Sequence, residues 1–596
     1  SEMCIRDRKS SIAALLAETM QRIDPQDPRT ALYAYLNGRT AACDVDNVAL
    51  VYPFGCNASQ KLAVQRALGN RVSVVEGPPG TGKTQTILNI VANLLMQGKT
   101  VGVVSNNNAA VDNVRDKLSK YEYGALMAEL GNRTRRQAFF ADKQQDFMPD
   151  PTWRLPAEER TALRTRLGEL SAAIDELFRV NAELADLRTK RSYAQCEYRH
   201  LLWEQPLDEA RMRRVDRCFF RPIDSRRALS FRHLVTERWQ GGRPSLALRA
   251  GLLFRCGAWP GKRLFADAEL LPAYADRKFY ETYIAELSAR IARLGAPSDE
   301  QRAKSLIEAY GKVSEALFRD MLYRKYERLN EARQEERPPF TMQNYRTHFR
   351  TFVERYPVVL STTHSLCASI GAGHLLDYVI IDESSQVDIL TAAVCCACCR
   401  NIIIIGDSRQ LPHIVEEQLR AKAEELRDKH RVPDAYDYVR QNILSSFKRV
   451  FGERLPVTLL REHYRCHPLI IDFCNRKYYR NELLIMTEPK GDYPFTVLTT
   501  TASKTYSHNG RIYNQRQIDA TCDWIERQHT EYAAMRFASD AKRESPAERI
   551  AERLIGGILA EEDRFSAIGV HRHYRLYDLV GRNVELSDEE RLFVRR

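Results

Sequence analysis

The sequence contains no uncharged apolar run of the roughly 18 to 20 residues that a membrane-spanning helix needs. The closest candidate, from Val387 to Ile405, is interrupted by Asp388 and Arg400. No segment near the start combines a charged end, an apolar centre and a small-residue cleavage site, so a secretory signal is not indicated. We therefore expect a cytoplasmic protein with no membrane partner. Because the first residue is Ser1, we expect an N-terminus that is incomplete or processed.

A disulfide framework is also missing, although the chain holds 14 cysteines. The cysteines show no paired spacing, which favours a reducing compartment. The tightest cluster comprises Cys395, Cys396, Cys398 and Cys399. Four ligands this close together do not suit metal coordination from one helix, so we expect them to pack as small apolar side chains on a buried helix. His463 and His467 are likewise not expected to bind a metal.

The remaining composition is that of a large globular protein. Its 596 residues (68.6 kDa) exceed what one hydrophobic core organises, so several domains are expected. An apolar content of 44% excludes a wholly disordered chain. Ninety lysines and arginines against 78 acidic residues give a formal charge of +12, which favours polyanionic partners.

Two regions, 51–120 and 351–445, alternate short β-branched runs with helical stretches, the pattern of βαβ units. Runs this apolar fit parallel strands that are covered on both faces. Strands are expected at Val358–Leu360, Val379–Ile381, Ile402–Ile405, Val457–Leu460, Phe495–Leu498 and Ala567–Val570. We divide the chain into an N-terminal segment (1–50), two parts of one α/β domain (51–120 and 351–445), an insertion between them (121–350) and a second domain (446–596).

The insertion contains two stripes of apolar residues at heptad spacing. The first stripe comprises Leu163, Leu170, Leu177 and Leu184, with Leu167 and Ile174 at the intervening positions. The second begins with Ile284, Leu287, Ile291 and Leu294 and continues with Leu306, Tyr310, Val313 and Leu317. About a hundred residues separate the stripes, so they would pair as an antiparallel coiled-coil stalk.

The segment that such a stalk would carry, residues 211–263, holds thirteen arginines and only three acidic residues. Aromatic residues are interleaved with the arginines: Phe219, Phe220, Phe231, Trp239, Phe254 and Trp259. Arginines and aromatic rings together would grip phosphates and stack on bases. A solvated basic surface, or a module that docks on a protein partner, is the alternative.

A Gly-rich turn follows the apolar run Ser73–Val75 and precedes a helical stretch from Thr84 to Met96. The turn is Gly77-Pro78-Pro79-Gly80-Thr81-Gly82-Lys83-Thr84. In this setting the glycines let backbone N–H groups surround phosphate oxygens, and the helix N-terminus adds positive potential. Lys83 would neutralise the β and γ phosphates of ATP, and the Thr84 hydroxyl would bind Mg²⁺.

A second strand supplies the carboxylates that such a loop needs. The apolar run Tyr378–Ile381 ends in Asp382 and Glu383, at the end of the strand where α/β sheets place ligands. Asp382 would hold Mg²⁺ directly or through water, and Glu383 would orient and deprotonate the attacking water. The chemistry indicated is hydrolysis of the γ-phosphate without a covalent intermediate.

Further motifs stand in a fixed order around these two: Asn57–Gln60, Ser105–Asp112, Gly406–Pro412 and Leu460–Pro468. As an ordered set they resemble the superfamily 1 helicases, specifically the branch that contains the nonsense-mediated-decay helicase and senataxin. The resemblance covers about 53–120 and 357–479. It implies an α/β fold with two RecA-like parallel-sheet domains, the second incomplete, and a large helical insertion in the first.

The resemblance also implies roles for residues around the nucleotide. Gln60 would read the adenine edge with two hydrogen bonds, and the ring of Tyr464 would stack on the adenine. Gln410 would sense the γ-phosphate between nucleotide and nucleic acid. Arg465 would reach the γ-phosphate from the second domain, so that closure of the two domains depends on ATP.

A third set of positions would contact nucleic acid. Asn108, Thr362 and Thr363 match residues that line the track of a single-stranded DNA or RNA, where side chains grip phosphates and sugars rather than bases. The family's members hydrolyse ATP to move along such a strand, so we expect an ATP hydrolase and helicase. We expect it to act as a monomer.

The end of the chain departs from the family pattern. Ile568–Val570 is followed by His571–Arg575, with Tyr577 where the family has glutamine, and no second family arginine follows. A fragment, a frameshifted end or a defective motor would each explain the departure. Two hypotheses stand: an ATP-driven helicase or translocase, and a nucleotide-gated nucleic-acid-binding switch or scaffold with little or no unwinding.

Overall fold

The computed structural model describes residues 16–488, apart from 44–48, 142–146, 205–207, 238, 240–242, 267, 296, 332–339, 372 and 416, together with 506–508, 511–513, 516 and 520. Its centre is a seven-stranded sheet in the order β3-β4-β2-β5-β6-β1-β7, and every strand pair in it is parallel. The strands are β1 (Val72–Glu76), β2 (Val101–Ser105), β3 (Met127–Glu129), β4 (Val358–Thr362), β5 (Leu376–Asp382), β6 (Cys399–Gly406) and β7 (Val457–Leu459). This is the predicted α/β, RecA-like fold.

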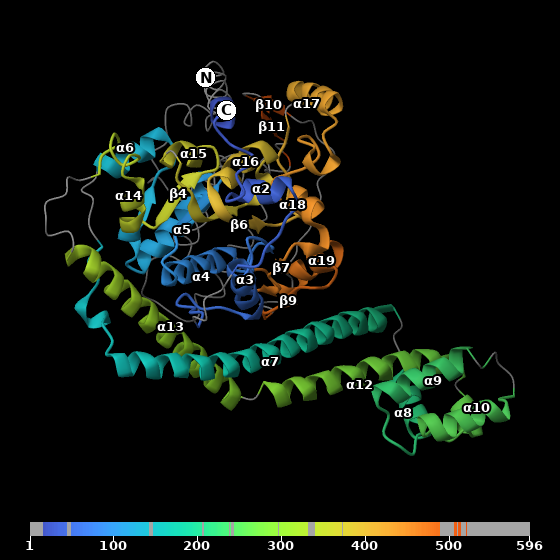
Figure 1. Ribbon diagram of the computed structural model, residues 1–596. Coiled ribbons are helices and arrows are strands. Elements are labelled where there is room, and N and C mark those ends of the chain that lie inside the picture. Colours follow the sequence, from blue (N-terminus) through green and yellow to red (C-terminus); the bar gives the residue numbers. More distant parts are fainter. Residues whose placement is uncertain are drawn as a thin grey trace. The chain divides into compact units, whose positions relative to one another are not determined.

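Helices cover both faces of the sheet (Figure 1). Because successive side chains of a strand point to opposite faces, Ile403 and Ile405 join one apolar core while Ile402 and Ile404 join the other. The first core is closed by α3 (Ala58–Leu68), α4 (Lys83–Met96) and α5 (Asn108–Lys120). The second is closed by α2 (Ala31–Leu36), α14 (Phe349–Arg355), α16 (Ile389–Ala397) and α18 (Ile443–Phe451). Shorter or more peripheral helices are α6 (Arg133–Ala141), α15 (Leu366–Ser369) and α17 (Glu417–His430).

The cysteine cluster lies where the sequence predicts it. Cys395 and Cys396 are on α16, and Cys399 begins β6; all three are buried in the second core. Burial raises the pKa of each of these thiols above its ordinary value. They therefore act as small apolar packing residues.

The boundary predicted between the two domains is wrong. Val457–Leu459 does form a strand, but β7 pairs with β1 at the edge of the first sheet instead of starting the second domain. The preceding helix α18 buries Ile443, Phe447 and Phe451 in the second core of the first domain. A short apolar run carries no information on which sheet it joins, so the pattern alone could not place it. Strand β3 was not predicted either, because it has only three residues.

The two apolar stripes pair as an antiparallel stalk. Helix α7 (Ala157–Glu204) packs against both α12 (Leu271–Leu294) and α13 (Pro297–Glu331). The end of α7 meets the start of α12, where the Tyr198 hydroxyl donates to Glu281, and the start of α7 meets α13. The second stripe is broken at Gly295, which ends α12, so α12 and α13 are separate helices.

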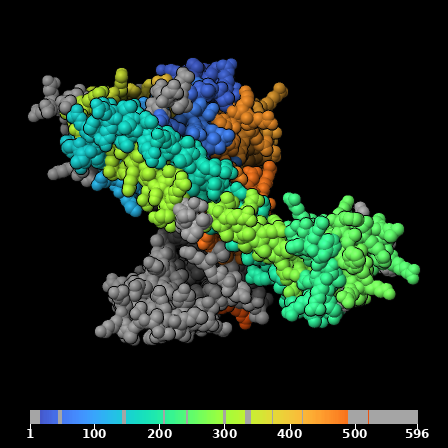
Figure 2. Space-filling view, turned by 90° about the horizontal axis from the view of Figure 1, so that it is seen from below, coloured from blue at the N-terminus to red at the C-terminus, as the bar shows by residue number. Residues whose placement is uncertain are grey.

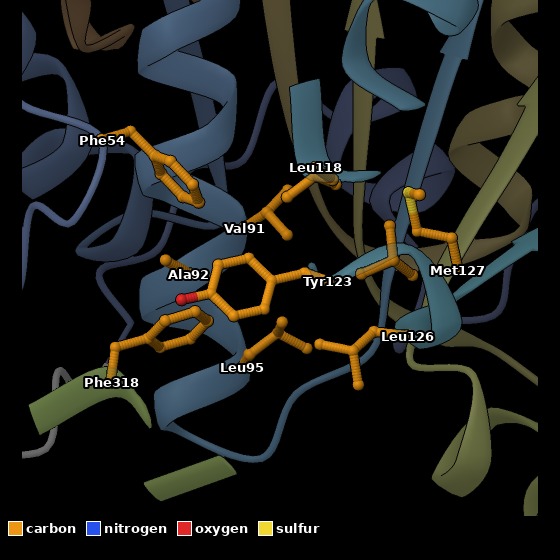
Figure 3. Close-up of a pocket in the computed structure, with 10 residues that line it drawn as sticks. Phe54, Val91, Ala92, Leu95, Leu118, Tyr123, Leu126, Met127 and Phe318 are labelled. Carbon is orange, nitrogen blue, oxygen red and sulfur yellow. The ribbon is translucent and has the colours of Figure 1, made fainter. Parts of the chain in front are cut away.

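The stalk is rooted in the first core. Phe318 of α13 packs edge-on against Tyr123 at a centroid distance of 5.2 Å, and Figure 3 shows it beside Leu95 of α4. The same apolar cluster includes Leu167 and Leu170 of α7. The buried Lys61 ammonium of α3 lies 2.7 Å from the exposed Asp175 of α7. The base of the stalk is thus part of the first α/β domain.

At its far end the stalk carries a small helical body with a core of its own, which we call the tip. It comprises α8 (Glu209–Asp216), α9 (Ser225–Glu237), α10 (Leu246–Gly251), a π-helical turn (Leu252–Cys256) and α11 (Lys262–Phe265). Phe231, Leu234 and Leu252 pack there against Leu271 and Tyr274 of α12. The Arg-rich segment is therefore folded.

A second sheet begins after β7. Strand β8 (Glu462–His463), helix α19 (Pro468–Tyr478) and strand β9 (Leu484–Ile485) form a parallel βαβ unit. Beyond Lys490 lies a separate compact unit, of which the structure describes an antiparallel pair, β10 (Tyr506–His508) and β11 (Arg511–Tyr513). The strands predicted at Phe495–Leu498 and Ala567–Val570, and the departure at His571–Tyr577, lie outside the described residues. No helix in the described part of the chain has the length and apolar content to cross a membrane.

Candidate functional site

The parallel sheet brings the predicted motifs to one edge. In a parallel sheet all strands end on the same side, and here the register aligns the ends closely. Ser105 of β2 is level with both Asp382 of β5 and Thr362 of β4, and Glu76 of β1 is level with Gly406 of β6. Strand β6 lies between β1 and β5, so the carboxylates come from the next strand but one to the phosphate loop.

The loop from Gly77 to Thr84 has the geometry of a phosphate cradle. Gly80 and Gly82 have φ values of +85° and +86°, a region that favours glycine. A Cβ on Gly82 would lie 2.1 Å from Nε2 of Gln60, so a larger residue would displace the Gln60 amide in addition to straining the backbone. Helix α4 begins directly after Gly82, at Lys83. Backbone N–H groups of the loop and the helix N-terminus therefore face the same space.

The catalytic groups predicted from the sequence lie together. Nζ of Lys83 is 3.5 Å from Oε1 of Glu383. The Glu383 backbone N–H donates to Oδ1 of Asp382 at 2.8 Å, and Glu383 has a left-handed backbone with φ of +50°. This conformation is uncommon for a residue with a side chain, and it turns the chain sharply at the end of β5.

Asp382 is nearly enclosed. Burial first, and then the charge of Glu383, raise the pKa of Asp382 to about 6, while the charge of Lys83 and the Glu383 N–H oppose the shift. A buried carboxylate held next to another one gains from a cation. Oε2 of Glu383 is buried and has no hydrogen-bond partner among the described residues.

These groups fit a magnesium ion. Mg²⁺ prefers oxygen ligands, which the Asp382 carboxylate and the Thr84 hydroxyl provide. Oγ of Thr84 accepts a hydrogen bond from Nδ2 of Asn113 at 3.3 Å, which orients the hydroxyl. Asn113 was not predicted from the sequence; its position on α5, five residues after Asn108, is the only signal that places it at this edge.

The structure places Gln60 beside the phosphate loop, but its amide is engaged within the protein. Nε2 of Gln60 donates to the carbonyls of Thr81 and Gly82 and to Gln85, at 3.1 to 3.3 Å. Its Oε1 accepts from the N–H of Asn57, which completes a capping box at the start of α3. In this conformation Gln60 supports the loop, and to read adenine its side chain has to turn.

The loop after β8 is attached to the phosphate loop. The Tyr464 N–H donates to the Gly80 carbonyl at 3.1 Å, and the Cβ of Arg465 lies 2.5 Å from where a Gly80 Cβ would stand. Arg465 itself is exposed and forms no ion pair with any described residue. The structure thus brings Arg465 next to the loop that carries Lys83.

His463 and Tyr464 flank this contact. His463 is fully buried, and burial followed by the charge of Arg465 lowers the pKa of His463 to about 4, so the ring is neutral at pH 7. The ring of Tyr464 is half exposed, while burial of its hydroxyl end raises the pKa of Tyr464 to about 12. A half-exposed ring beside the phosphate loop is suited to stacking. The structural role of His463 was not predicted.

Gln410 lies in the loop after β6. Its backbone N–H donates to the Asp407 carbonyl at 3.1 Å, and its side chain is partly exposed at the same sheet edge. The hydroxyl of Tyr479, the residue that caps the end of α19, donates to Oδ2 of Asp407 at 2.7 Å, so the second βαβ unit is bonded to this loop as well. The segment that holds Gln410 is thus in direct contact with that unit.

Two of the three residues predicted to contact nucleic acid are accessible. Asn108 begins α5 and Thr362 ends β4, and both are partly exposed at the edge where the strands end. Thr363 is fully buried, so its side chain does not face solvent in this structure. The next exposed donor on this edge is Asn106, whose Nδ2 donates to the Gln386 carbonyl at 3.2 Å.

The all-parallel sheet, with the glycine loop and the acidic pair at its carboxyl edge, defines a phosphate-loop nucleotide-binding protein of the RecA-like class. The sequence pattern of the AAA domain family matches residues 55–418, more than half of the chain. The chain belongs to this family and, within it, to the superfamily 1 helicases of the branch that contains the nonsense-mediated-decay helicase and senataxin.

Relatives support this placement. An uncharacterized ATP-dependent helicase of Mycoplasma genitalium is 22% identical over 550 residues, which are 77% of this chain and 48% of the relative. The DNA polymerase alpha-associated DNA helicase A of Schizosaccharomyces pombe is 39% identical over 93 residues, 15% of this chain and 14% of the relative. A regulator of nonsense transcripts 1 homolog of Neurospora crassa is 32% identical over 129 residues, which are 21% of this chain and 11% of the relative. The chain spans about half the length, or less, of these curated relatives, and their names do not favour the switch or scaffold hypothesis.

Proposed function

We propose that this protein couples hydrolysis of Mg-ATP to movement along a single strand of DNA or RNA. The observation that carries the proposal is the convergence of Lys83, Glu383 and Arg465 on one loop, from two different sheets. An enzyme that only binds a nucleotide needs the cradle and the cation. An enzyme that converts hydrolysis into movement also needs a cation from a second body, because loss of the γ-phosphate then releases that body.

The nucleotide would bind with its phosphates in the loop from Gly77 to Thr84. Lys83, which now contacts Glu383, would turn to the β and γ phosphates, whose charge is larger. Asp382 and Thr84 would hold Mg²⁺, and the ion would neutralise charge on the phosphate oxygens. The adenine would lie against the half-exposed ring of Tyr464.

Hydrolysis would depend on Glu383. Its carboxylate, freed from Lys83, would accept a hydrogen bond from the attacking water and take its proton as the oxygen approaches phosphorus. Gln410 and Arg465 would contact the γ-phosphate from the other side of the cleft. The attack is in line and needs no covalent intermediate, so positioning and charge compensation supply the catalysis.

Movement would follow from the two attachments of the second βαβ unit. One is the Tyr464–Gly80 hydrogen bond at the phosphate loop, and the other is the Tyr479–Asp407 bond at the Gln410 loop. Both lie at the sheet edge that also carries Asn108 and Thr362. A strand held by those donors through its sugars and phosphates would be shifted each time the unit closes on ATP and opens after hydrolysis.

The decisive experiment measures ATP turnover with and without a single strand, for the native protein and for Glu383→Gln. We expect the strand to stimulate turnover, and the substitution to lower the stimulated rate roughly 100- to 10,000-fold while ATP binding persists. The matched control is Glu425→Gln, on the exposed face of α17, which should leave turnover unchanged. ATP binding without any turnover that responds to a strand would contradict the proposal.

A further inference from the structure

The tip carries nearly all of the excess charge of the chain. Its segment 211–263 contains thirteen arginines and one lysine but three acidic residues, whereas the whole chain has a formal charge of only +12. Figure 2 shows the surface of the tip in green. The rest of the chain is close to neutral, so a polyanion that approaches this protein is attracted chiefly to the tip.

The few acidic residues of the tip are already paired. The Tyr274 hydroxyl donates to Asp216 at 2.6 Å, and Asp224 accepts from the Arg227 N–H at 2.8 Å. Glu237 contacts His233. By contrast, Arg217, Arg255 and Arg263 are exposed and form no ion pair with any described residue. Their charges are not compensated within the tip.

A cleft with aromatic walls lies beside Arg217. Two segments that are far apart in the sequence form a short antiparallel bridge there: the Phe220 N–H donates to the Gly257 carbonyl at 2.9 Å, and the Trp259 N–H donates to the Cys218 carbonyl at 2.7 Å. The bridge leaves the rings of Phe220 and Trp259 on the surface, 55% and 66% exposed. The cleft is lined by Arg217, Cys218, Phe219, Phe220, Leu253 and Trp259.

The floor of the cleft is fixed to the core of the tip. Phe219 alternates with Phe220 along the bridge, so it points inward. Its ring stacks on Tyr274 at a centroid distance of 5.9 Å and meets Phe231 edge-on at 5.2 Å. The backbone that carries the exposed Phe220 ring is therefore anchored by the packing of the adjacent Phe219 ring.

The walls are also held individually. Trp259 lies over Gly261, where a Cβ would come within 3.1 Å of the indole ring, so the ring occupies the place of a side chain. The guanidinium of Arg221 lies 5.7 Å from the centroid of the Phe220 ring, in cation–π geometry. Arg263 is close enough to Cys218 to oppose the rise that burial causes in the pKa of that thiol, so its charge reaches the cleft. Flat, exposed rings beside an exposed arginine that forms no ion pair with any described residue are a platform for unstacked bases.

We infer that this cleft is a second nucleic-acid site, which binds a single strand by stacking its bases on Trp259 and Phe220 while Arg217 and Arg263 contact its phosphates. A double helix keeps its bases inside, so it would meet only the arginines. An acidic peptide would satisfy the charges but would leave both rings without flat partners. The site uses no residue of the nucleotide cleft, and it goes beyond the proposed function because it binds whether or not ATP is hydrolysed.

The test follows tryptophan fluorescence of the full chain without ATP, because a base stacked on an indole quenches its emission. We expect a short oligothymidylate to quench the native protein, and we expect most of that quenching to be lost in Trp259→Phe. The matched control is Trp203→Phe, an 81% exposed tryptophan near the end of α7, which should retain the quenching. Thermal unfolding of each variant shows that the fold is intact.

Binding is then measured by the anisotropy of a labelled oligonucleotide. We expect Phe220→Ala combined with Trp259→Ala to weaken binding at least tenfold, and Arg217→Ala to lower the slope of log affinity against log salt by about one. Unchanged affinity in the double variant overturns the inference, as does equal quenching by polyphosphate, which has charge but no bases. Equal quenching by oligoglutamate would identify a protein-docking surface instead. A loss of strand-stimulated ATP turnover alone would affect only the proposed function, since this binding is measured without ATP.

Discussion

The nucleotide-binding domain and the tip both bind polyanions in our account, but they present charge in opposite ways. Around the phosphate loop a few charged groups are held close together: Lys83 lies against Glu383, and Asp382 is enclosed between sheet and loop. At the tip Arg217, Arg255 and Arg263 are exposed and form no ion pair with any described residue, and exposed aromatic rings lie on a small core. The first arrangement suits chemistry at one atom, and the second suits a grip on a flexible strand.

The difference follows from the frameworks. A parallel sheet places its strand ends to within one residue of register, as Ser105, Asp382 and Thr362 show, so a catalytic geometry can be built on it. The described residues of the tip form no such sheet; short helices and a two-stranded bridge shape its surface. The domain therefore holds its functional groups in a precise geometry, whereas the tip carries a large positive charge on its surface.

The largest loss of stability should come from removing the apolar contact between the base of the stalk and the core of the first domain. Phe318→Ala removes a buried ring at the base of the stalk (Figure 3) and should lower the free energy of unfolding by about 3 to 5 kcal/mol. The matched change in the tip, Phe254→Ala, removes a ring that is 75% exposed and should cost less than about 0.5 kcal/mol. Chemical denaturation followed by circular dichroism measures both; equal losses would contradict the assignment of Phe318 to the core.

Lys83→Ala should separate the two regions by function. Losing a charge-assisted contact with the phosphates should weaken ATP binding roughly 10- to 100-fold. Tip binding should not change, because Lys83 belongs to α4 and the cleft of Phe220 and Trp259 lies elsewhere in the chain. Isothermal titration measures the affinity for ATP, and fluorescence quenching measures oligonucleotide binding at the tip. Unchanged ATP affinity would contradict the phosphate-loop assignment.

Acid should weaken the domain through His463. The unfolded chain takes up a proton on this ring near pH 6.5, whereas the folded protein does so only near pH 4, because burial and the charge of Arg465 oppose it. The unfolded state therefore binds more protons between these values, and stability falls as the pH falls from 6.5 to 4. Thermal unfolding across this range should show a shallower decline in His463→Gln than in the native protein.

The control for this prediction is His430→Gln, which changes an exposed histidine at the end of α17. Its pH profile should follow that of the native protein. Comparing variants cancels the contribution of Asp382, whose raised pKa acts in the opposite direction: the folded protein binds its proton more tightly, so acidification to pH 6 and below favours folding. If the stability of His463→Gln changed with pH in the same way as that of the native protein does, His463 would not be the cause of the acid destabilisation.

The smallest effect should come from the surface charges of the stalk. Arg290 of α12 contacts Glu183 of α7 at 2.5 Å, but the arginine is largely exposed. Arg290→Ala should change the free energy of unfolding by less than about 0.5 kcal/mol, since exposed ion pairs contribute little. Leu287→Ala, one turn away in the apolar seam between α7 and α12, should cost about 2 kcal/mol or more. Similar losses in a thermal unfolding comparison would mean that charge holds the stalk together.

Much of the first domain could be predicted because its signals are local. Ile402–Ile405 and Val379–Ile381 are strands as expected, since a β-branched apolar run fits little else than a buried parallel strand. The heptad stripes correctly predicted that the two halves of the stalk pair. Residues 457–459, by contrast, were assigned to the wrong sheet, because the choice between two sheets is made by packing far away in the sequence.

The sequence by itself predicted the chemistry of the domain: the spacing from Gly77 to Thr84 and the pair Asp382–Glu383 are the residue types, in the order, that a phosphate cradle and its carboxylates require. Only the tertiary structure decided that Gln60 is engaged by the loop, that Thr363 is buried, and that Arg465 lies against Gly80. It alone also separated the aromatic residues of the tip into core and surface. Which face a ring presents depends on contacts between distant segments, and no local pattern encodes those contacts.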